Sequence, residues 1–119
     1  MGLFSKLFGS KKNEKKGPPE HEVVIHFYYG STNYQHMYAI EDLIRTTIID
    51  AAVGKYEGHE IADDGSDVSL FFYGPDAEAL YRVMSPILAE SPFMRGATVT
   101  LWFGPRKWGT QKRIIELPS

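Results

Sequence analysis

The sequence predicts an α+β domain in which the order strand, helix, strand occurs twice. Two apolar, aromatic-rich runs, residues 23–30 (VVIHFYYG) and residues 67–74 (DVSLFFYG), each end in glycine, which is typical of a strand followed by a turn. Each run is followed by apolar residues at helical spacing and then by a second run with strand character. The two halves therefore resemble each other, and both predict the same three elements.

Two helices are expected between the strands. In the first half, apolar residues recur every three or four positions at Met37, Ile40, Ile44, Ile48 and Ala51. Gly54 then stands where a helix C-cap glycine is expected. In the second half, the helical positions are Ala77, Leu80, Met84 and Leu88. Asp76 is the expected N-cap, and Pro86 predicts a kink or break near Ser85.

The remaining runs complete a βαββαβ order. Strands are expected at YEGHEIAD after Gly54 and at ATVTLWFG after Gly96, and DDGSD predicts a hairpin between the halves. The order resembles the ferredoxin-like (split βαβ) fold over residues 22–104, a four-stranded antiparallel sheet with two helices on one face. The whole chain also resembles small bacterial proteins that have no assigned function, so no site residue is carried over. Near the C-terminus, RIIEL is expected either to add an edge strand or to fold over the sheet.

Composition narrows the functional classes. The 119 residues suit one domain, and 43% hydrophobic with 24% charged residues exclude a collagen-like or fully disordered chain. No apolar run approaches the roughly 18 residues that a membrane-spanning helix needs. Cysteine is absent, which excludes disulfides, a thiol nucleophile and a thiolate metal site.

Charge divides the chain into a tail, residues 1–19, and a domain, residues 20–119. Five lysines and one glutamate give the tail a net charge of +4, so the domain carries −6 of the total of −2. An acidic domain has the wrong sign for a phosphate backbone, so nucleic acid is not expected as a partner. The expected location is the cytoplasm. If the tail binds lipid, the protein would instead lie at the surface of the inner membrane.

The tail is the basis of one functional hypothesis, a membrane-surface accessory protein. Its apolar side chains would share one face of a helix, and lysines follow them. The residues expected to contact anionic lipid are Leu3, Phe4, Leu7, Phe8, Lys11 and Lys12. The alternative is a solvated tail that keeps an acidic domain in solution.

The sheet face that the helices leave open is the basis of the preferred hypothesis. Outward-facing candidates on it are His26, Tyr28, Phe71, Tyr73 and Trp102. Hydropathy places Phe27 in the core and Phe71 outside, whereas aligning the two halves puts both residues at the same position of the repeat. Because a one-residue slip in a loop would shift that alignment, we expect the orientation that hydropathy indicates. Large exposed apolar surfaces are uncommon on monomers, so a second copy, the RIIEL segment or a ligand should cover these rings. RNA-binding modules stack bases on such aromatics, but the acidic domain disfavours RNA.

Evidence for chemistry is sparse. The loop Gly30, Ser31, Thr32 and Asn33, with His36 after it, could bind an anion at a helix N-terminus, although a helix N-cap also explains it. His36 and Glu41 could serve as acid or base there, but no nucleophile is identified. The four histidines lack metal-ligand spacing, so neither a metal nor another cofactor is expected. We therefore expect a non-catalytic protein-interaction module, a homodimer, and keep as the alternative a small-anion binder or minor enzyme using this loop.

Overall fold

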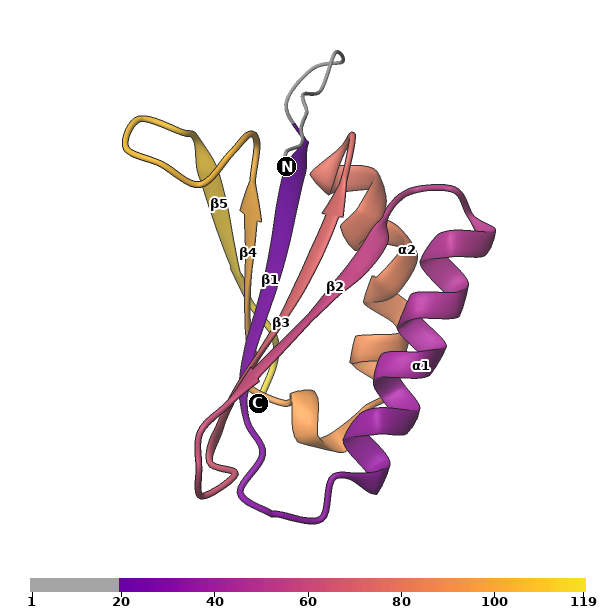
Figure 1. Ribbon diagram of the computed structural model, residues 1–119, viewed down its shortest axis with the longest axis vertical. Coiled ribbons are helices and arrows are strands. Elements are labelled where there is room, and N and C mark those ends of the chain that lie inside the picture. Colours follow the sequence, from indigo (N-terminus) through magenta and orange to yellow (C-terminus); the bar gives the residue numbers. More distant parts are fainter. Residues whose placement is uncertain (1–19) are drawn as a thin grey trace, which may run out of the picture.

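The computed structural model describes residues 20–119 as an α+β fold with two α-helices packed on an antiparallel sheet (Figure 1). The strands are β1 (His21–Tyr28), β2 (Lys55–Ile61), β3 (Asp67–Gly74), β4 (Thr98–Trp102) and β5 (Lys112–Glu116). The helices are α1 (Gln35–Asp50), α2 (Ala77–Ala89) and the short 3-10 helix η1 (Pro92–Met94). The predicted tail, with all of its predicted membrane contacts, lies outside the described residues.

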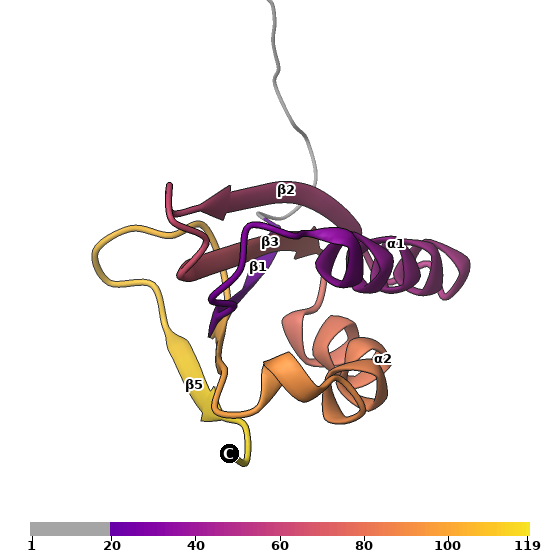
Figure 2. The same cartoon turned by 90° about the horizontal axis from the view of Figure 1, so that it is seen from below.

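The sheet is open and has five strands in the order β2-β3-β1-β4-β5, with every neighbouring pair antiparallel. The four-stranded sheet expected from the repeat is therefore extended by one strand. The segment RIIEL supplies this strand, because β5 pairs along the outer edge of β4 rather than folding across the sheet. Figure 2 shows both helices on the same side of the sheet, so within residues 20–119 the other face carries no helix.

The core lies between that sheet and the two helices. Every second residue of the central strands is buried, and the strand residues of the core are Val23, Ile25, Phe27, Val68, Leu70, Phe72, Val99 and Leu101. Because side chains alternate along a strand, the residues between them face away from the helices. The pairing of Phe27 with Val68 confirms the orientation that hydropathy predicted and shows that aligning the two halves displaces β1 by one residue.

The predicted C-cap of α1 is wrong, and so is the break that Pro86 was expected to cause if it did not kink α2. Gly54 does not cap α1; the left-handed residue there is Ala52, and Gly54 instead packs so tightly that a Cβ would lie 2.4 Å from the Tyr73 carbonyl oxygen. Helix α2 does not break near Ser85 but continues through Pro86 to Ala89. Pro86 and Arg82 are both exposed, so water can reach the Arg82 carbonyl that Pro86 leaves without a backbone donor.

The predicted start of α2 is confirmed. The carboxylate of Asp76 accepts hydrogen bonds from the backbone N–H groups of Glu78 and Ala79. The first residue of the helix has a further partner, because the N–H of Ala77 donates to Nδ1 of His21 at 3.0 Å. A side chain from the first residue of β1 therefore fixes the N-terminus of a helix that follows much later in the sequence.

Candidate functional site

Most of the open face of the sheet consists of three rows of side chains that run across all five strands. The strand register places Gly58, Phe71, Val24, Thr100 and Ile114 in the middle row. The row on one side of it consists of Lys55, Tyr73, Glu22, Trp102 and Lys112, and the row on the other side of Glu60, Ser69, His26, Thr98 and Glu116. The middle row, hereafter the neutral stripe, contains no charged side chain and crosses all five strands.

The row that ends in Lys55 and Lys112 has a buried carboxylate, that of Glu22, at its centre. Glu22 is only 2% exposed, and its Oε1 lies 2.6 Å from Nε of Arg106, which reaches it from the β4–β5 connection. The same guanidinium lies 5.6 Å from the ring centroid of Phe71. Burial, and next the neighbouring Glu22 carboxylate, raise the pKa of Tyr73 above its usual value, so this phenol stays protonated at neutral pH.

The five predicted surface residues do share the open face, but they do not form one continuous exposed patch. Tyr28 is 70% exposed and His26 is exposed beside Asp67, 3.3 Å away. The other three side chains are half-buried, and two of their rings have a cation of the same chain beside them: Arg106 lies over Phe71, and the Lys112 ammonium lies 4.8 Å from the centroid of Trp102. Cationic side chains of the same chain therefore lie against Phe71 and Trp102 on this face.

Ile114, which was not among the predicted surface residues, is the exposed end of the neutral stripe. It lies in the middle of β5, opposite Thr100, and 53% of its surface is accessible. Both of its neighbours on the open face, Lys112 and Glu116, are charged and of opposite sign. The segment KRIIE has two charged residues, two apolar residues and one charged residue, so it does not alternate. It could have indicated an exposed Ile114 only once β5 was known to be an edge strand.

The predicted loop lines a different feature, a cavity of about 570 Å³ between the start of α1 and the segment after α2. Ser31, Asn33 and His36 contribute to its wall, while Gly30 and Thr32 do not. The remaining lining is mainly apolar and consists of Tyr29, Ala39, Ile40, Glu90, Ser91, Pro92 and Phe93. The loop is anchored to the β2–β3 hairpin, because the N–H of Gly30 donates to the Gly65 carbonyl at 2.8 Å.

Polar groups of this loop are largely engaged within the loop itself. The Ser31 hydroxyl accepts a hydrogen bond from the N–H of Asn33, and the side-chain oxygen of Asn33 accepts one from the N–H of Gln35. The N-cap position of α1 is Tyr34, whose side chain makes no capping hydrogen bond. These contacts explain Ser31 and Asn33 without a bound anion.

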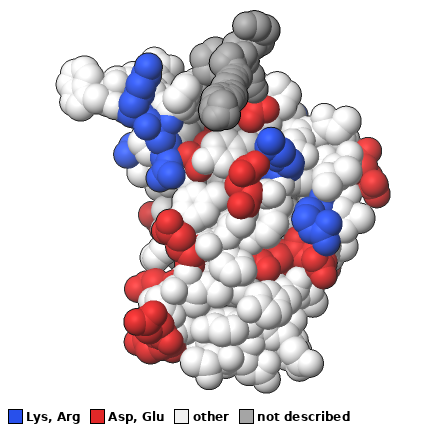
Figure 3. All heavy atoms as spheres, in the orientation of Figure 1, with Lys and Arg blue, Asp and Glu red and all other residues white. Residues whose placement is uncertain are grey.

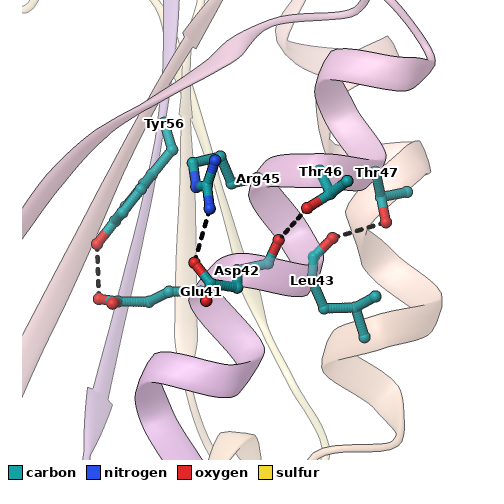
Figure 4. A network of polar contacts seen from close by, with 7 residues as sticks. All are labelled: Glu41, Asp42, Leu43, Arg45, Thr46, Thr47 and Tyr56. Carbon is teal, nitrogen blue, oxygen red and sulfur yellow. Dashed lines mark hydrogen bonds and ion pairs between the residues drawn. The ribbon is translucent and has the colours of Figure 1, made fainter.

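His36 and Glu41 do not form the acid–base pair that was considered. His36 lines the cavity, whereas Glu41 is buried elsewhere and accepts a hydrogen bond from the Tyr56 hydroxyl at 2.6 Å (Figure 4). Nδ1 of His59 lies 2.7 Å from the same carboxylate. Burial, and next the hydrogen bond to Glu41, raise the pKa of Tyr56 well above its usual value. This cluster links α1 to β2, and Glu41 is not part of the cavity wall.

In residues 20–119 no group of three or more His, Asp or Glu side chains is placed to hold a metal ion. No helix of this part of the chain is long and apolar enough to cross a membrane. No known protein family, curated protein or solved structure matches the chain.

Proposed function

We propose that the protein is a non-catalytic interaction module that forms a homodimer through the β5 side of its open sheet face. The observation that carries this proposal is the neutral stripe, which ends at the edge of the sheet in the exposed side chain of Ile114. An uncharged centre between rows that end in charged residues is the usual anatomy of a protein contact surface, with an apolar core and a polar rim.

The finer fold assignment belongs to the same proposal. We infer a ferredoxin-like arrangement to which β5 has been added, supported by the element order and by the position of β3 between β1 and β2. In that arrangement one sheet face has no helices, so a contact at the β5 side of this face leaves the helical layer and the core undisturbed.

The proposal is tested by sedimentation equilibrium of the full chain over a range of concentrations. We expect a dimer, and we expect Ile114→Lys to shift the chain to monomer. Each copy would then place a lysine at the centre of the contact, where its charge would lose water without gaining an acidic partner. The matched control is Leu43→Lys on α1, where the replaced side chain is similarly exposed at 51%. A wild-type chain that remains monomeric at its highest soluble concentration would contradict the proposal.

The cavity favours a second candidate function, binding of a small molecule with an apolar ring. Its volume lies within the range of ligand sites, and Tyr29 and Phe93 provide aromatic walls with ring centroids 5.3 Å apart. His36 and Glu90 both line the cavity and are exposed. His36 would favour an anionic ligand, whereas Glu90 would favour a cationic one. Thermal melts with benzoate and with benzylamine separate these preferences. Stabilisation by benzoate that is lost in His36→Ala supports the anionic alternative, and no stabilisation by either compound rejects the site.

A further inference from the structure

The backbone of β5 presents a regular free edge. The ladder between β4 and β5 is bounded by two hydrogen bonds, from the N–H of Leu117 to the Ala97 carbonyl at 2.9 Å and from the N–H of Phe103 to the Gln111 carbonyl at 3.0 Å. In an antiparallel pair, hydrogen-bonded and non-hydrogen-bonded residue pairs alternate. The odd-numbered residues of β5 therefore bond to β4, and the even-numbered ones direct their N–H and C=O groups away from it.

Three residues thus share two properties. The backbone groups of Lys112, Ile114 and Glu116 point to the free edge, and their side chains lie on the open face beside Trp102, Thr100 and Thr98. No other strand within residues 20–119 pairs with this edge, which lies on the far side of the sheet from β2 (Figure 1). An edge strand with unpaired N–H and C=O groups is a template for one more strand.

The sequence of this edge is complementary to itself. If a second copy of β5 runs antiparallel about a two-fold axis at Ile114, then Ile114 faces Ile114 of the other copy and Lys112 faces Glu116. In this register all three facing pairs consist of residues whose backbone groups point to the edge, so each pair can exchange two hydrogen bonds. Opposite charges and apolar side chains that face each other across strands are stabilising. Shifting the register by two residues removes one of the three pairs and separates the charges.

The chain also limits this pairing to one place. Beyond Glu116 the next even-numbered residue is Pro118, which has no N–H to donate. The opposite edge of the sheet is irregular, because the register of β2 shifts between Tyr56 and Gly58, and Gly58 has a positive φ of 131°. Such a bulge disrupts an edge and hinders the addition of a strand.

We infer that two copies of this chain join through their β5 strands into one continuous antiparallel sheet, with Lys112 of each copy paired to Glu116 of the other. This inference rests on the proposed function and specifies how the dimer forms. In the joined sheet the neutral stripe continues from one copy into the next through the two Ile114 side chains. The row that ends in Lys112 in one copy then meets the row that ends in Glu116 in the other. Figure 3 shows basic side chains gathered at the upper left of the molecule and acidic side chains below them.

A charge-exchange experiment tests the register directly. Lys112→Glu and Glu116→Lys are prepared as separate full-length variants, and self-association is measured by sedimentation for each variant alone and for an equimolar mixture. Each variant alone places like charges opposite each other twice, so we expect its dimer dissociation constant to rise about tenfold or more. In the mixture every charged position faces an opposite charge, so we expect heterodimers with an affinity close to that of the wild type.

Backbone pairing has an independent readout. In hydrogen exchange, the N–H groups of Lys112, Ile114 and Glu116 should be protected at high protein concentration and not at low concentration, whereas Arg113 and Ile115 should be protected at both. Dimers of each variant alone that are as tight as the wild type, with no heterodimer preference, would overturn this register while leaving the proposed function intact. A wild-type chain that is monomeric throughout would overturn both.

Discussion

Nε of Arg106 lies 2.6 Å from Oε1 of Glu22, so a side chain from the β4–β5 connection neutralises a carboxylate that the central strand buries. The two partners differ in environment, since the Glu22 side chain is 3% exposed and that of Arg106 is 48% exposed. A buried charge that loses its partner is strongly destabilising, whereas removing both charges costs less. This pair ties the connection before β5 to the strand at the centre of the sheet.

The first prediction concerns that pair. Arg106→Met should lower the free energy of unfolding by about 2 kcal/mol, less than for a fully buried pair because solvent reaches the guanidinium. Urea denaturation measures this loss. The double variant Glu22→Gln, Arg106→Met should recover part of it, because the unpaired carboxylate is gone. A double variant as unstable as the sum of both single variants would show that the two side chains do not interact.

The sequence predicted most of the fold because the pattern of alternation was strong where strands are half-buried. Hydropathy predicted which face of β1 and which face of β3 are buried. In β1, for example, the alternate residues Val23, Ile25 and Phe27 form the apolar set, and all three lie in the core. The end of α1 was not predictable in the same way. The tight approach of Gly54 to the Tyr73 carbonyl is a tertiary contact, and the left-handed residue after the helix is the non-glycine Ala52.

The candidate surface was predictable only in part, for a similar reason. Alternation along each strand showed that Phe71 and Trp102 face away from the helices. The cations beside their rings depend on tertiary structure, because Arg106 reaches Phe71 from the β4–β5 connection and Lys112 faces Trp102 only when β5 pairs with β4. The edge position of β5 depends on strand order, and the sequence left open whether this segment lay beside the sheet or across it. The free edge and the role of Ile114 therefore emerged from the structure.

The second prediction concerns the turn that supports the predicted loop. Gly65 has a φ of 75°, and a Cβ at this residue would lie 2.1 Å from the carbonyl oxygen of Ser31. Gly65→Ala should therefore destabilise the fold by about 2 kcal/mol through backbone strain and the clash together. The matched control is Gly109→Ala, which has a φ of 92° but no atom within 4 Å of the added Cβ. Thermal melts should show the larger loss for Gly65→Ala, and equal losses would mean that the contact with Ser31 contributes nothing.

The third prediction concerns the contact between β1 and α2. His21→Ala leaves the buried N–H of Ala77 without its acceptor, which should cost about 1–3 kcal/mol of the free energy of unfolding. The comparison variant His26→Ala removes an exposed histidine from the same strand and should change stability by less than about 0.5 kcal/mol. Urea denaturation of both variants separates the loss of the helix contact from a general effect of removing a histidine.

The last prediction is an alkaline pH dependence that originates in Tyr56. Burial, and next the hydrogen bond to Glu41, raise the pKa of this phenol in the folded protein above its usual value of 10.0, so folding favours the protonated form. The stabilisation is therefore fully present below about pH 10 and is lost as the pH rises above that value. Tyr56→Phe removes the hydrogen bond to the Glu41 carboxylate, which should cost about 1.5–3 kcal/mol at neutral pH.

Urea midpoints measured between neutral pH and pH 11 test this origin. The stability of the wild type should fall steeply at the alkaline end, and that of Tyr56→Phe should fall less steeply, because the variant has no phenol to ionise there. Tyr28→Phe is the matched control, since that phenol is 70% exposed and its removal should leave the slope unchanged. If Tyr56→Phe retains the full alkaline slope, the loss of stability arises from other groups, and the link between α1 and β2 does not depend on a protonated Tyr56.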